Sequence, residues 1–175
     1  MSSQMHDSAE APVALVTGSG QRLGAHIIST LHARGMRVVV HYRQSGVAAR
    51  ELCARLEGAR ADSTLQVAAD LADPEAPQAL IEAVRARWGR LDVLVNNAAL
   101  FHPTPLAEST VTQWDEMTGV NLRAPYFLAQ AALPLLKAQG GNIINIVDVY
   151  AERPRPRFAI YCAAKAGLVG LTRAL

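Results

Sequence analysis

Short apolar runs alternate with longer amphipathic runs along most of the chain. Five runs are mostly apolar and short enough for strands that are buried on both faces of a sheet: 13–17, 36–41, 65–69, 91–95 and 142–147. Helical periodicity follows them over 25–34, 47–57, 74–87, 112–138 and 157–175. Strands that alternate with helices predict an α/β domain, in which right-handed βαβ units form a parallel sheet covered on both faces.

Proline and glycine refine these boundaries. We expect Pro74 in the first turn of its helix and Pro125 at a bend in the long helix 112–138, which Gly140 and Gly141 end. Residues 1–12 are polar, lack the apolar segment of a secretory signal, and are predicted to form a disordered tail before a single domain over 13–175.

Composition excludes several functional classes. Half of the 175 residues are apolar, which supplies ample core for one globular domain. The net charge of +2 is too small to indicate nucleic acid or an anionic membrane as a partner, and no apolar run approaches the roughly 18–20 residues of a spanning helix. Cys53 and Cys162 show no metal-ligand spacing, so we expect no metal and a reducing, cytoplasmic location.

Polar residues and a glycine follow the predicted strands. Gly18, His41, Asp70, Asn97 and Asp148 each stand just after one of them, or at its last residue. Ligands of open parallel sheets bind beyond the carboxyl ends of the strands. These residues are therefore predicted to converge on one edge of the sheet, which is the main evidence within the sequence for an enzyme site.

A glycine-rich turn, Gly18-Ser-Gly-Gln-Arg-Leu-Gly24, joins the first predicted strand to the first helix. Glycines allow a tight turn and close backbone approach, and the helix N-terminus offers free N–H groups to a diphosphate. The spacing differs from the G-x-G-x-x-G fingerprint, and glycine-rich turns also occur without nucleotides.

The segment after the second strand bears on the choice of cofactor. It reads His41-Tyr42-Arg43-Gln44-Ser45 and lacks the carboxylate that usually holds the ribose hydroxyl of NAD. Arg43 could pair with the 2′-phosphate of NADP and Ser45 could donate a hydrogen bond to it. The alternative is a solvated loop. Asp70, at the end of the third strand, stands where an adenine amino group could bind.

Tyr161 and Lys165 are spaced i and i+4 at the start of the last helix, so the phenol and the ammonium can share one small volume. A nearby cation would lower the phenol pKa and suit Tyr161 to proton transfer. The same spacing also arises by chance on many helices.

Together these residues resemble the short-chain dehydrogenase/reductase family from Val13 onward. The matching pieces are Thr17-Gly18 with Gly24, Asp70, Asn96-Asn97-Ala98, Asn121, and Tyr161 with Lys165. Within that family the chain is most similar to the pteridine reductases. The features that point there are Arg22 in place of a glycine, the segment 41–45, the loop beginning at Phe101, and Asp148, which stands 13 residues before Tyr161 where most relatives carry a serine.

The resemblance implies a Rossmann-type, doubly wound α/β/α fold and a homotetramer that uses NADPH to reduce a dihydropteridine or folate. It implies catalytic roles for Asp148, Tyr161, Lys165 and Asn121, with Tyr161 and Asp148 donating the proton and Asn121 holding a water. It also implies substrate contacts from Arg22, Phe101, Asp148 and Tyr161. The implied cofactor-binding residues are Gly18, Arg22, Leu23, Gly24, His41, Tyr42, Arg43, Gln44, Ser45, Asp70, Leu71, Asn97, Ala98, Ala99, Tyr161 and Lys165.

Asp148 also has a simpler interpretation, as a cap of the loop before Pro154 or an ion-pair partner of a neighbouring arginine. The sequence departs from the pteridine reductase pattern at Ala99, where a serine is expected, and at Gln44. Family members continue past the helix that carries Lys165, so we expect this chain to be truncated after its sixth helix. The alternative functions are a carbonyl reductase acting on a 3-oxoacyl or sugar ketone, and a non-catalytic NADP-binding sensor.

Overall fold

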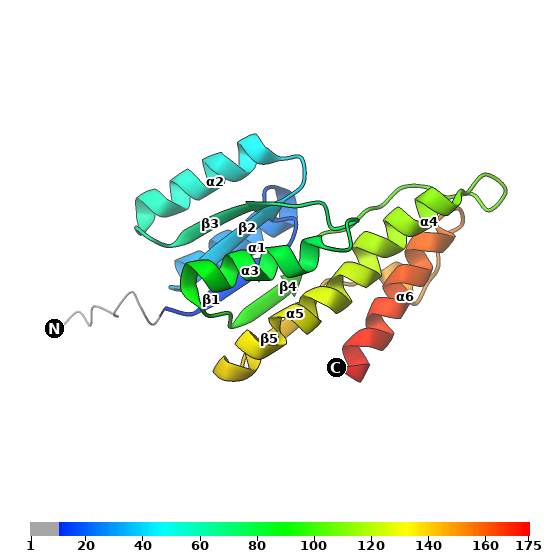
Figure 1. Ribbon diagram of the computed structural model, residues 1–175. Coiled ribbons are helices and arrows are strands. Elements are labelled where there is room, and N and C mark those ends of the chain that lie inside the picture. The colour runs from blue at the N-terminus through cyan, green and yellow to red at the C-terminus, as the bar shows by residue number, and fades with distance from the viewer. Residues whose placement is uncertain (1–10) are drawn as a thin grey trace.

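A five-stranded parallel sheet forms the centre of the molecule (Figure 1). The computed structural model describes residues 11–175. The strands are β1 (Val13–Val16), β2 (Arg37–Tyr42), β3 (Thr64–Ala68), β4 (Val93–Asn96) and β5 (Asn142–Asn145). They lie in the order β3-β2-β1-β4-β5, and every neighbouring pair is parallel. This doubly wound order confirms the predicted Rossmann-type fold.

Helices cover both faces of the sheet and continue beyond its edge (Figure 1). The α-helices are α1 (Arg22–Ala33), α2 (Gly46–Ala59), α3 (Ala76–Trp88), α4 (Val111–Thr118), α5 (Ala124–Gln139) and α6 (Ala159–Ala174). A π-helical segment, η2 (Gly119–Arg123), joins α4 to α5, and a short 3-10 helix, η3 (Val149–Ala151), precedes α6. Helix α6 packs against α4, η2 and η3.

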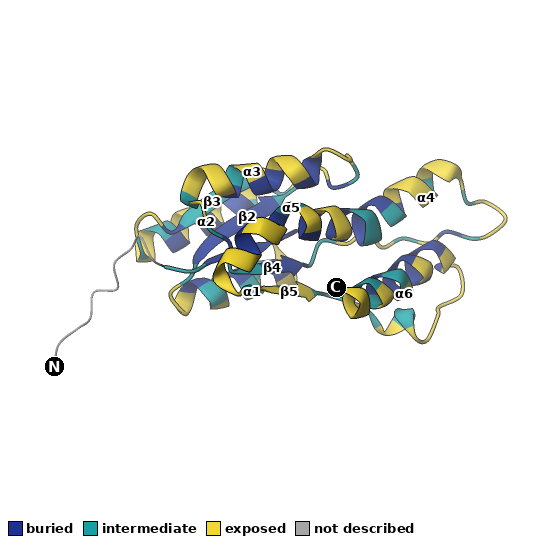
Figure 2. Cartoon of the chain, turned by 60° about the horizontal axis from the view of Figure 1, so that its bottom comes forward, coloured by how far each residue is buried: buried dark blue, intermediate teal, exposed yellow. Residues whose placement is uncertain are grey.

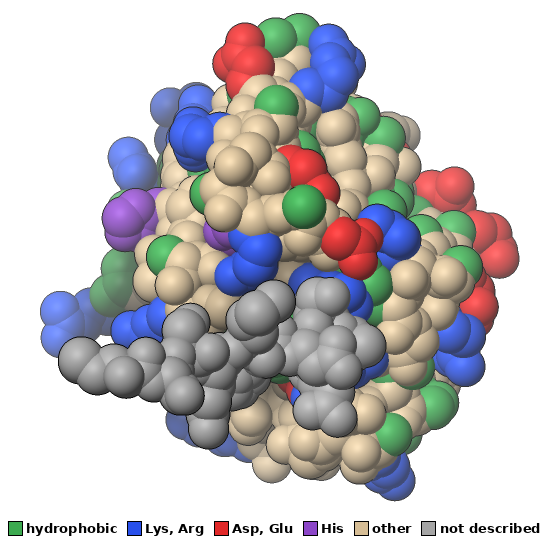
Figure 3. Space-filling model, turned by 90° about the vertical axis from the view of Figure 1, so that its left-hand side faces the viewer, with side chains coloured by type: hydrophobic (Ala, Val, Ile, Leu, Met, Phe, Trp, Pro, Cys, Tyr) green, Lys and Arg blue, Asp and Glu red, His purple; other side chains and the backbone are tan. Residues whose placement is uncertain are grey.

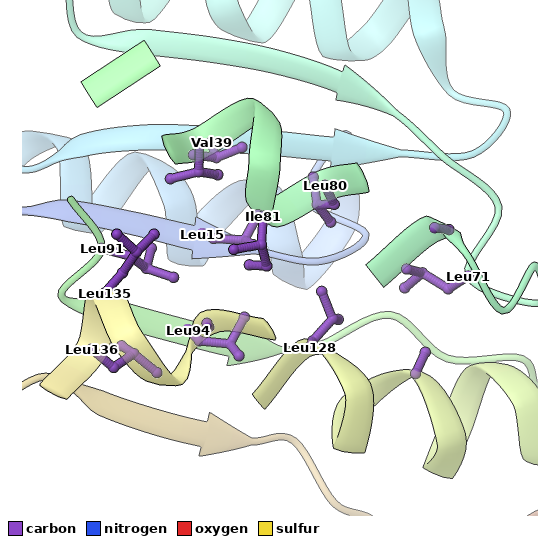
Figure 4. Packing of buried hydrophobic residues seen from close by; sticks show 14 of the residues in the cluster. Leu15, Val39, Leu71, Leu80, Ile81, Leu91, Leu94, Leu128, Leu135 and Leu136 are labelled. Carbon is purple, nitrogen blue, oxygen red and sulfur yellow. The ribbon is translucent and has the colours of Figure 1, made fainter. Parts of the chain in front are cut away.

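Alternating strand residues divide the core between the two faces. In β2, Val39 packs into the cluster that includes α3 and α5, whereas Val38 and Val40 pack into the cluster beneath α1 and α2. Strand residues point alternately to opposite faces, so a strand buried on both sides must be apolar throughout. Figure 4 shows the first cluster, in which Leu15 and Leu94 of the sheet meet Ile81 and Leu128 of the helices.

The long helical region departs from its prediction. The sequence predicted one helix over 112–138 with a bend at Pro125; the structure interrupts it earlier, in η2, and Pro125 lies in the first turn of α5. The helical backbone is continuous from η2 into α5, and Ala124 N bonds the Gly119 carbonyl five residues back. Pro125 has no N–H and lies four residues after Asn121 of η2, so the irregular turn falls where the proline removes a helical hydrogen bond.

Three boundary predictions also need correction. Pro12 was assigned to the tail, but its carbonyl accepts a hydrogen bond from Arg37 N at 2.8 Å, so ordered chain begins before β1; residues 1–10 of that tail lie outside the described residues. Pro74 lies in a turn before α3, whose first-turn proline is Pro77. Helix α6 begins at Ala159 instead of Arg157, because Arg157 has a positive φ of 69°.

Exposure is uneven over the surface. Figure 2 shows exposed residues along the outer faces of α4 and α6, and Ile144 of the edge strand β5 is 48% exposed. Figure 3 shows Lys and Arg side chains interspersed with Asp and Glu around the side of the molecule where the strands begin. Across 11–175, every helix is too short or too polar to span a membrane.

Candidate functional site

A cavity of about 360 Å³ lies at the carboxyl ends of β1, β2, β3 and β4. Its lining contains every predicted cofactor-binding residue except Tyr161 and Lys165. Four further residues line it that the sequence analysis did not select: Gln21, Ala69, Leu100 and Val120. The fold thus brings segments that are far apart in the sequence around one space large enough for part of a nucleotide.

The glycine-rich turn leaves its backbone open to this cavity. Gly18 has a φ of +64°, and a Cβ on Gly24 would lie 2.4 Å from the Gly18 carbonyl oxygen and 2.7 Å from Asn97 Nδ2. Only glycine fits Gly24 without displacing these groups. Arg22 has a φ of 53°, in the left-handed region that glycine adopts most readily. The turn and the N-terminus of α1 fit the diphosphate of a dinucleotide.

Thr17 and Asn97 hold the turn against the end of β4. The Thr17 hydroxyl accepts hydrogen bonds from the backbone nitrogens of Asn97 and Ala98, each at 3.0 Å. Asn97 Nδ2 donates to the carbonyl of Thr17 at 2.8 Å and to that of Gly18 at 3.3 Å. Thr17 belongs to the quoted motif, and the structure shows that its role is to organise the turn.

His41 supports the site from beneath instead of offering a free nitrogen to it. Its Nδ1 accepts a hydrogen bond from Gly18 N at 2.9 Å, which leaves Nε2 to donate to the Ala69 carbonyl at 3.1 Å. The ring is 2% exposed. This tautomer uses both nitrogens of the neutral imidazole. Burial lowers the pKa of His41, although the bond to Ala69 and the charge of Asp70 oppose this change.

We expect the free energy of unfolding to decrease as the pH falls from 7 to 5. The folded pKa of His41 lies below its unfolded value of 6.5, so the unfolded chain takes up the proton first. The contribution of His41 is present above pH 6.5 and is lost as the pH falls through the folded pKa. Urea unfolding across this range should give a shallower pH slope for His41→Gln than for the wild type, whereas the exposed His26→Gln should keep the wild-type slope. Equal slopes in all three proteins would contradict this role.

Arg43 and Asp70 face each other across the cavity. Arg43 Nη1 lies 3.7 Å from Asp70 Oδ2, and both side chains are nearly half exposed. Exposed pairs of this kind contribute about 0–1 kcal/mol. An anion that enters the cavity can therefore compete for Arg43 at little cost.

Asp148 and Tyr161 form the most direct contact between two predicted catalytic residues. The Tyr161 hydroxyl donates a hydrogen bond to Asp148 Oδ2 at 2.9 Å, and Asp148 Oδ1 accepts one from Tyr150 N at 2.9 Å. Asp148 therefore caps the short helix η3, which agrees with the part of the sequence interpretation that made it a cap of this loop. It also accepts the hydrogen bond of the phenol. No ion pair joins it to a neighbouring arginine within the described part of the chain.

The predicted direction of the Tyr161 pKa is wrong in this structure. Burial, followed by the hydrogen bond and charge of Asp148, raises the pKa of the phenol well above its usual value. Lys165 Nζ lies 5.8 Å from the centre of the Tyr161 ring and donates its hydrogen bond to the Ile146 carbonyl at 2.8 Å. The nearest charged group that contacts the phenol is thus a carboxylate. Burial also lowers the pKa of Lys165.

Asn121 lies in the π-helical segment η2 and is 1% exposed. Its Nδ2 donates to the carbonyls of Leu100 and Met117, each at 2.9 Å, which fixes the orientation of the amide. Its buried Oδ1 has no hydrogen-bond partner among the residues described. A buried acceptor of this kind needs a partner, and a water would supply one.

Aromatic rings enclose the other side of Tyr161. Phe101 lies edge-on to Tyr161, with ring centres 4.8 Å apart, and stacks on Phe158 at 4.6 Å with 15° between the planes. Phe101 is 48% exposed. It follows Leu100, whose carbonyl binds Asn121 and which lines the cavity. Tyr161 is therefore connected to the cavity through Phe101 and the adjacent Leu100.

The sequence analysis did not select Tyr150, Arg155 and Phe158, which meet near Phe101. All three lie between Asp148 and Tyr161 in the sequence. Aromatic and cationic residues so close together could have been noticed in the sequence. Their contact with Phe101 depends on the turn at Arg157, which the sequence does not indicate.

The chain is similar to known proteins over most of its length. The family model described as short chain dehydrogenase matches residues 12–175. Pteridine reductase 1 of Leishmania tarentolae is 38% identical over 97% of the chain, and a 3-oxoacyl-[acyl-carrier-protein] reductase of Synechocystis sp. is 37% identical over 93%. D-threitol dehydrogenase of Mycolicibacterium smegmatis is 35% identical over 95%. The chain spans 72%, 66% and 64% of these relatives' own lengths.

Proposed function

Since the chain belongs to the short-chain dehydrogenase family, we propose that the whole protein is an NADPH-dependent pteridine reductase. The observation that carries this proposal is the hydrogen bond of 2.9 Å between the Tyr161 hydroxyl and the Asp148 carboxylate. Bound NADPH would supply the hydride, which a C=N carbon of a dihydropteridine accepts. The residues of the chain would bind the two molecules and supply the proton for the ring nitrogen.

The geometry suits a dinucleotide. Gly18 and Gly24 leave room for the diphosphate at the N-terminus of α1, and Arg43 lies where a 2′-phosphate would pair with it. Asp70 would take the adenine amino group. Lys165, held by the Ile146 carbonyl beside Tyr161, would hydrogen-bond the nicotinamide ribose.

The carboxylate distinguishes a C=N substrate from a ketone. Reduction of a C=N bond is assisted when the nitrogen takes up a proton, and the resulting positive charge is stabilised by a nearby carboxylate. A ketone develops negative charge on oxygen, which Asp148 would repel. The raised pKa keeps Tyr161 protonated. Its single O–H points to Asp148 Oδ2 in the structure and would turn from that oxygen to the ring nitrogen to deliver the proton.

Arg22 and Phe101 would bind the flat substrate ring, Arg22 at its polar edge and Phe101 on its face. The buried, unpaired Oδ1 of Asn121 would hold the water through which the proton is replenished. By its resemblance the protein would act in the cytoplasm as a homotetramer.

Two rivals remain. The similarity to 3-oxoacyl and sugar-alcohol enzymes is nearly as high as that to the pteridine reductase, which favours a carbonyl reductase as the second candidate. A non-catalytic NADP-binding sensor is the third.

NADPH oxidation by the whole protein should be measured with a dihydropterin, a 3-oxoacyl thioester and a sugar ketone. The proposal expects turnover of the pterin; turnover of ketones alone, or of none, would reject it.

Removal of Arg43 should abolish the preference for NADPH. A charge-assisted pair with the 2′-phosphate contributes about 1.5–3 kcal/mol, which corresponds to roughly ten- to hundredfold discrimination. Arg43→Gln is expected to lower kcat/KM for NADPH by that factor and to leave kcat/KM for NADH unchanged. Arg50→Gln, an exposed arginine of α2, is the matched control. Equal efficiency of the wild type with both cofactors would refute the role of Arg43.

A further inference from the structure

We propose that Arg123 is a positioning residue that connects the adenosine end of the cavity with Asn121. It holds the π-helical segment η2 against the turn that follows Asp70, so that a cofactor bound at that turn also steadies the amide of Asn121. This role rests on the proposed function, which gives the adenine to Asp70 and the relay water to Asn121.

Arg123 reaches from η2 to a segment that is distant in the sequence. Its Nη2 donates a hydrogen bond of 2.5 Å to the carbonyl of Ala72, 51 residues away. Ala72 follows Asp70 and Leu71, which line the cavity after the end of β3, and Val120 of η2 also lines it. One charge-assisted hydrogen bond therefore joins two segments that both border the cofactor cavity.

The turn that receives this bond is organised around Asp70. Asp70 Oδ1 accepts a hydrogen bond from Ala72 N at 3.0 Å, and the Asp70 carbonyl accepts one from Asp73 N at 2.9 Å. Asp70 and Asp73 are exposed, whereas Leu71 is buried in the core. A turn held by few buried contacts keeps more freedom than the sheet, and an adenosine group packed on Asp70 and Leu71 would reduce that freedom.

Gly119 makes room for the guanidinium at the start of η2. A Cβ on Gly119 would lie 3.1 Å from Arg123 Nη2 and 3.7 Å from Ala72 Cα. The Gly119 carbonyl also accepts the hydrogen bond from Ala124 N that spans the π-helical turn. Since Gly119 has a helical φ of −54°, its lack of a side chain serves the contact with Arg123 and not the backbone conformation.

Asn121 lies between the two ends of this segment. Its Nδ2 is held by the Leu100 and Met117 carbonyls, and its buried Oδ1 is the group left for a water. A shift of η2 away from Ala72 would move that oxygen. A misplacement of about 1 Å near the reacting atoms can cost on the order of 100-fold in rate.

Arg123→Gln in the whole protein should lower kcat with NADPH and a dihydropterin by about 10- to 100-fold, the scale of such a misplacement. The KM for NADPH should change by less than about threefold, because Arg123 is not among the described residues that line the cavity. Arg123→Lys keeps a donor for the Ala72 carbonyl and should recover most of kcat. Arg55→Gln, an exposed arginine of α2, is the matched control.

Reduced nicotinamide mononucleotide delivers the same hydride without an adenosine half, so it separates a link between the two ends of the cavity from local packing. With this donor nothing fixes the Asp70 turn. Arg123→Gln should then lower kcat/KM by less than about threefold, whereas kcat/KM for NADPH should fall together with kcat. An equal loss with both donors would show that Arg123 serves only local packing, and would overturn the inference.

A second variant covers the case in which Arg123→Gln does not fold, which circular dichroism would reveal. Gly119→Ala suits the helical φ and leaves Arg123 in the chain, but its Cβ presses on the guanidinium. This variant should lower kcat with NADPH at least about threefold. A wild-type kcat in Gly119→Ala, or in a folded Arg123→Gln, would overturn the inference.

The outcomes distinguish this role from the proposed function. If the wild type reduces a dihydropterin and the variants keep its kcat, the role of Arg123 is wrong and the proposed function stands. If the wild type reduces only a 3-oxoacyl thioester, the proposed function fails, and the same comparisons with the thioester decide the role of Arg123. If the wild type reduces neither substrate, both fail.

Discussion

Replacement of Tyr161 by phenylalanine is expected to lower turnover with a dihydropterin by about 100-fold or more, the scale of a lost general acid. The phenol donates a hydrogen bond to Asp148, and among the described residues no other side chain donates one to that carboxylate. The phenylalanine ring can keep the edge-on contact with Phe101, so the site should retain its shape.

Tyr126→Phe is the matched control, because it removes a hydroxyl from an exposed tyrosine of α5 that lies outside the site. Single-turnover rates of NADPH oxidation should be measured for both variants, with circular dichroism to establish that they fold. Wild-type turnover in Tyr161→Phe would remove this residue from the mechanism.

Substitution of Asp148 should change which substrate is reduced. Asp148→Asn retains an oxygen that can cap η3 but loses the negative charge beside the phenol, so turnover of a dihydropterin is expected to fall about 100-fold. Asp148→Ser should lose pterin turnover to a similar degree. It should gain ketone turnover, because a neutral hydroxyl can donate to a developing oxyanion.

The measurement is kcat/KM for a dihydropterin and for a 3-oxoacyl thioester from pH 5 to 8. Asp115→Asn, an exposed acid on α4, serves as the control for loss of one negative charge. Full pterin activity of either Asp148 variant across this pH range would show that the carboxylate has no part in proton transfer.

The architecture and the cavity were predictable from the sequence because both depend on local pattern. Apolar runs such as 36–41 can be stable only when both faces of a strand are buried, and parallel strands bring their carboxyl ends to one edge. Gly24 and Asn97 could thus be assigned to one site before any contact was known, and the structure brings them within contact of each other.

The electrostatics of the site were less predictable. The spacing of Tyr161 and Lys165 placed the two side chains together but could not show that the Ile146 carbonyl binds the ammonium, or that Asp148 binds the phenol. The direction of a pKa depends on such partners and on burial, which are set by tertiary structure. For the same reason His41 was selected as a cofactor contact, although its nitrogens bind the backbone of Gly18 and Ala69.

The backbone conformation of two segments could not be predicted from the pattern of apolar and polar residues. The sequence Gly119–Arg123 gives no direct signal of a π-helical turn, so the prediction placed the irregularity at Pro125 instead of in the turn before it. The positive φ of Arg157 turns the loop so that Phe158 stacks on Phe101, and no residue preference in the sequence indicates this turn.

The most direct test of the account is the fate of the hydride. The whole protein should be given NADPH deuterated at C4 together with an equimolar mixture of a dihydropterin and a 3-oxoacyl thioester, and the products analysed by NMR. The account predicts deuterium on a ring carbon of the tetrahydropterin, with the thioester unchanged. Deuterium on the hydroxyl-bearing carbon of the reduced thioester, with none in the pterin, would contradict it.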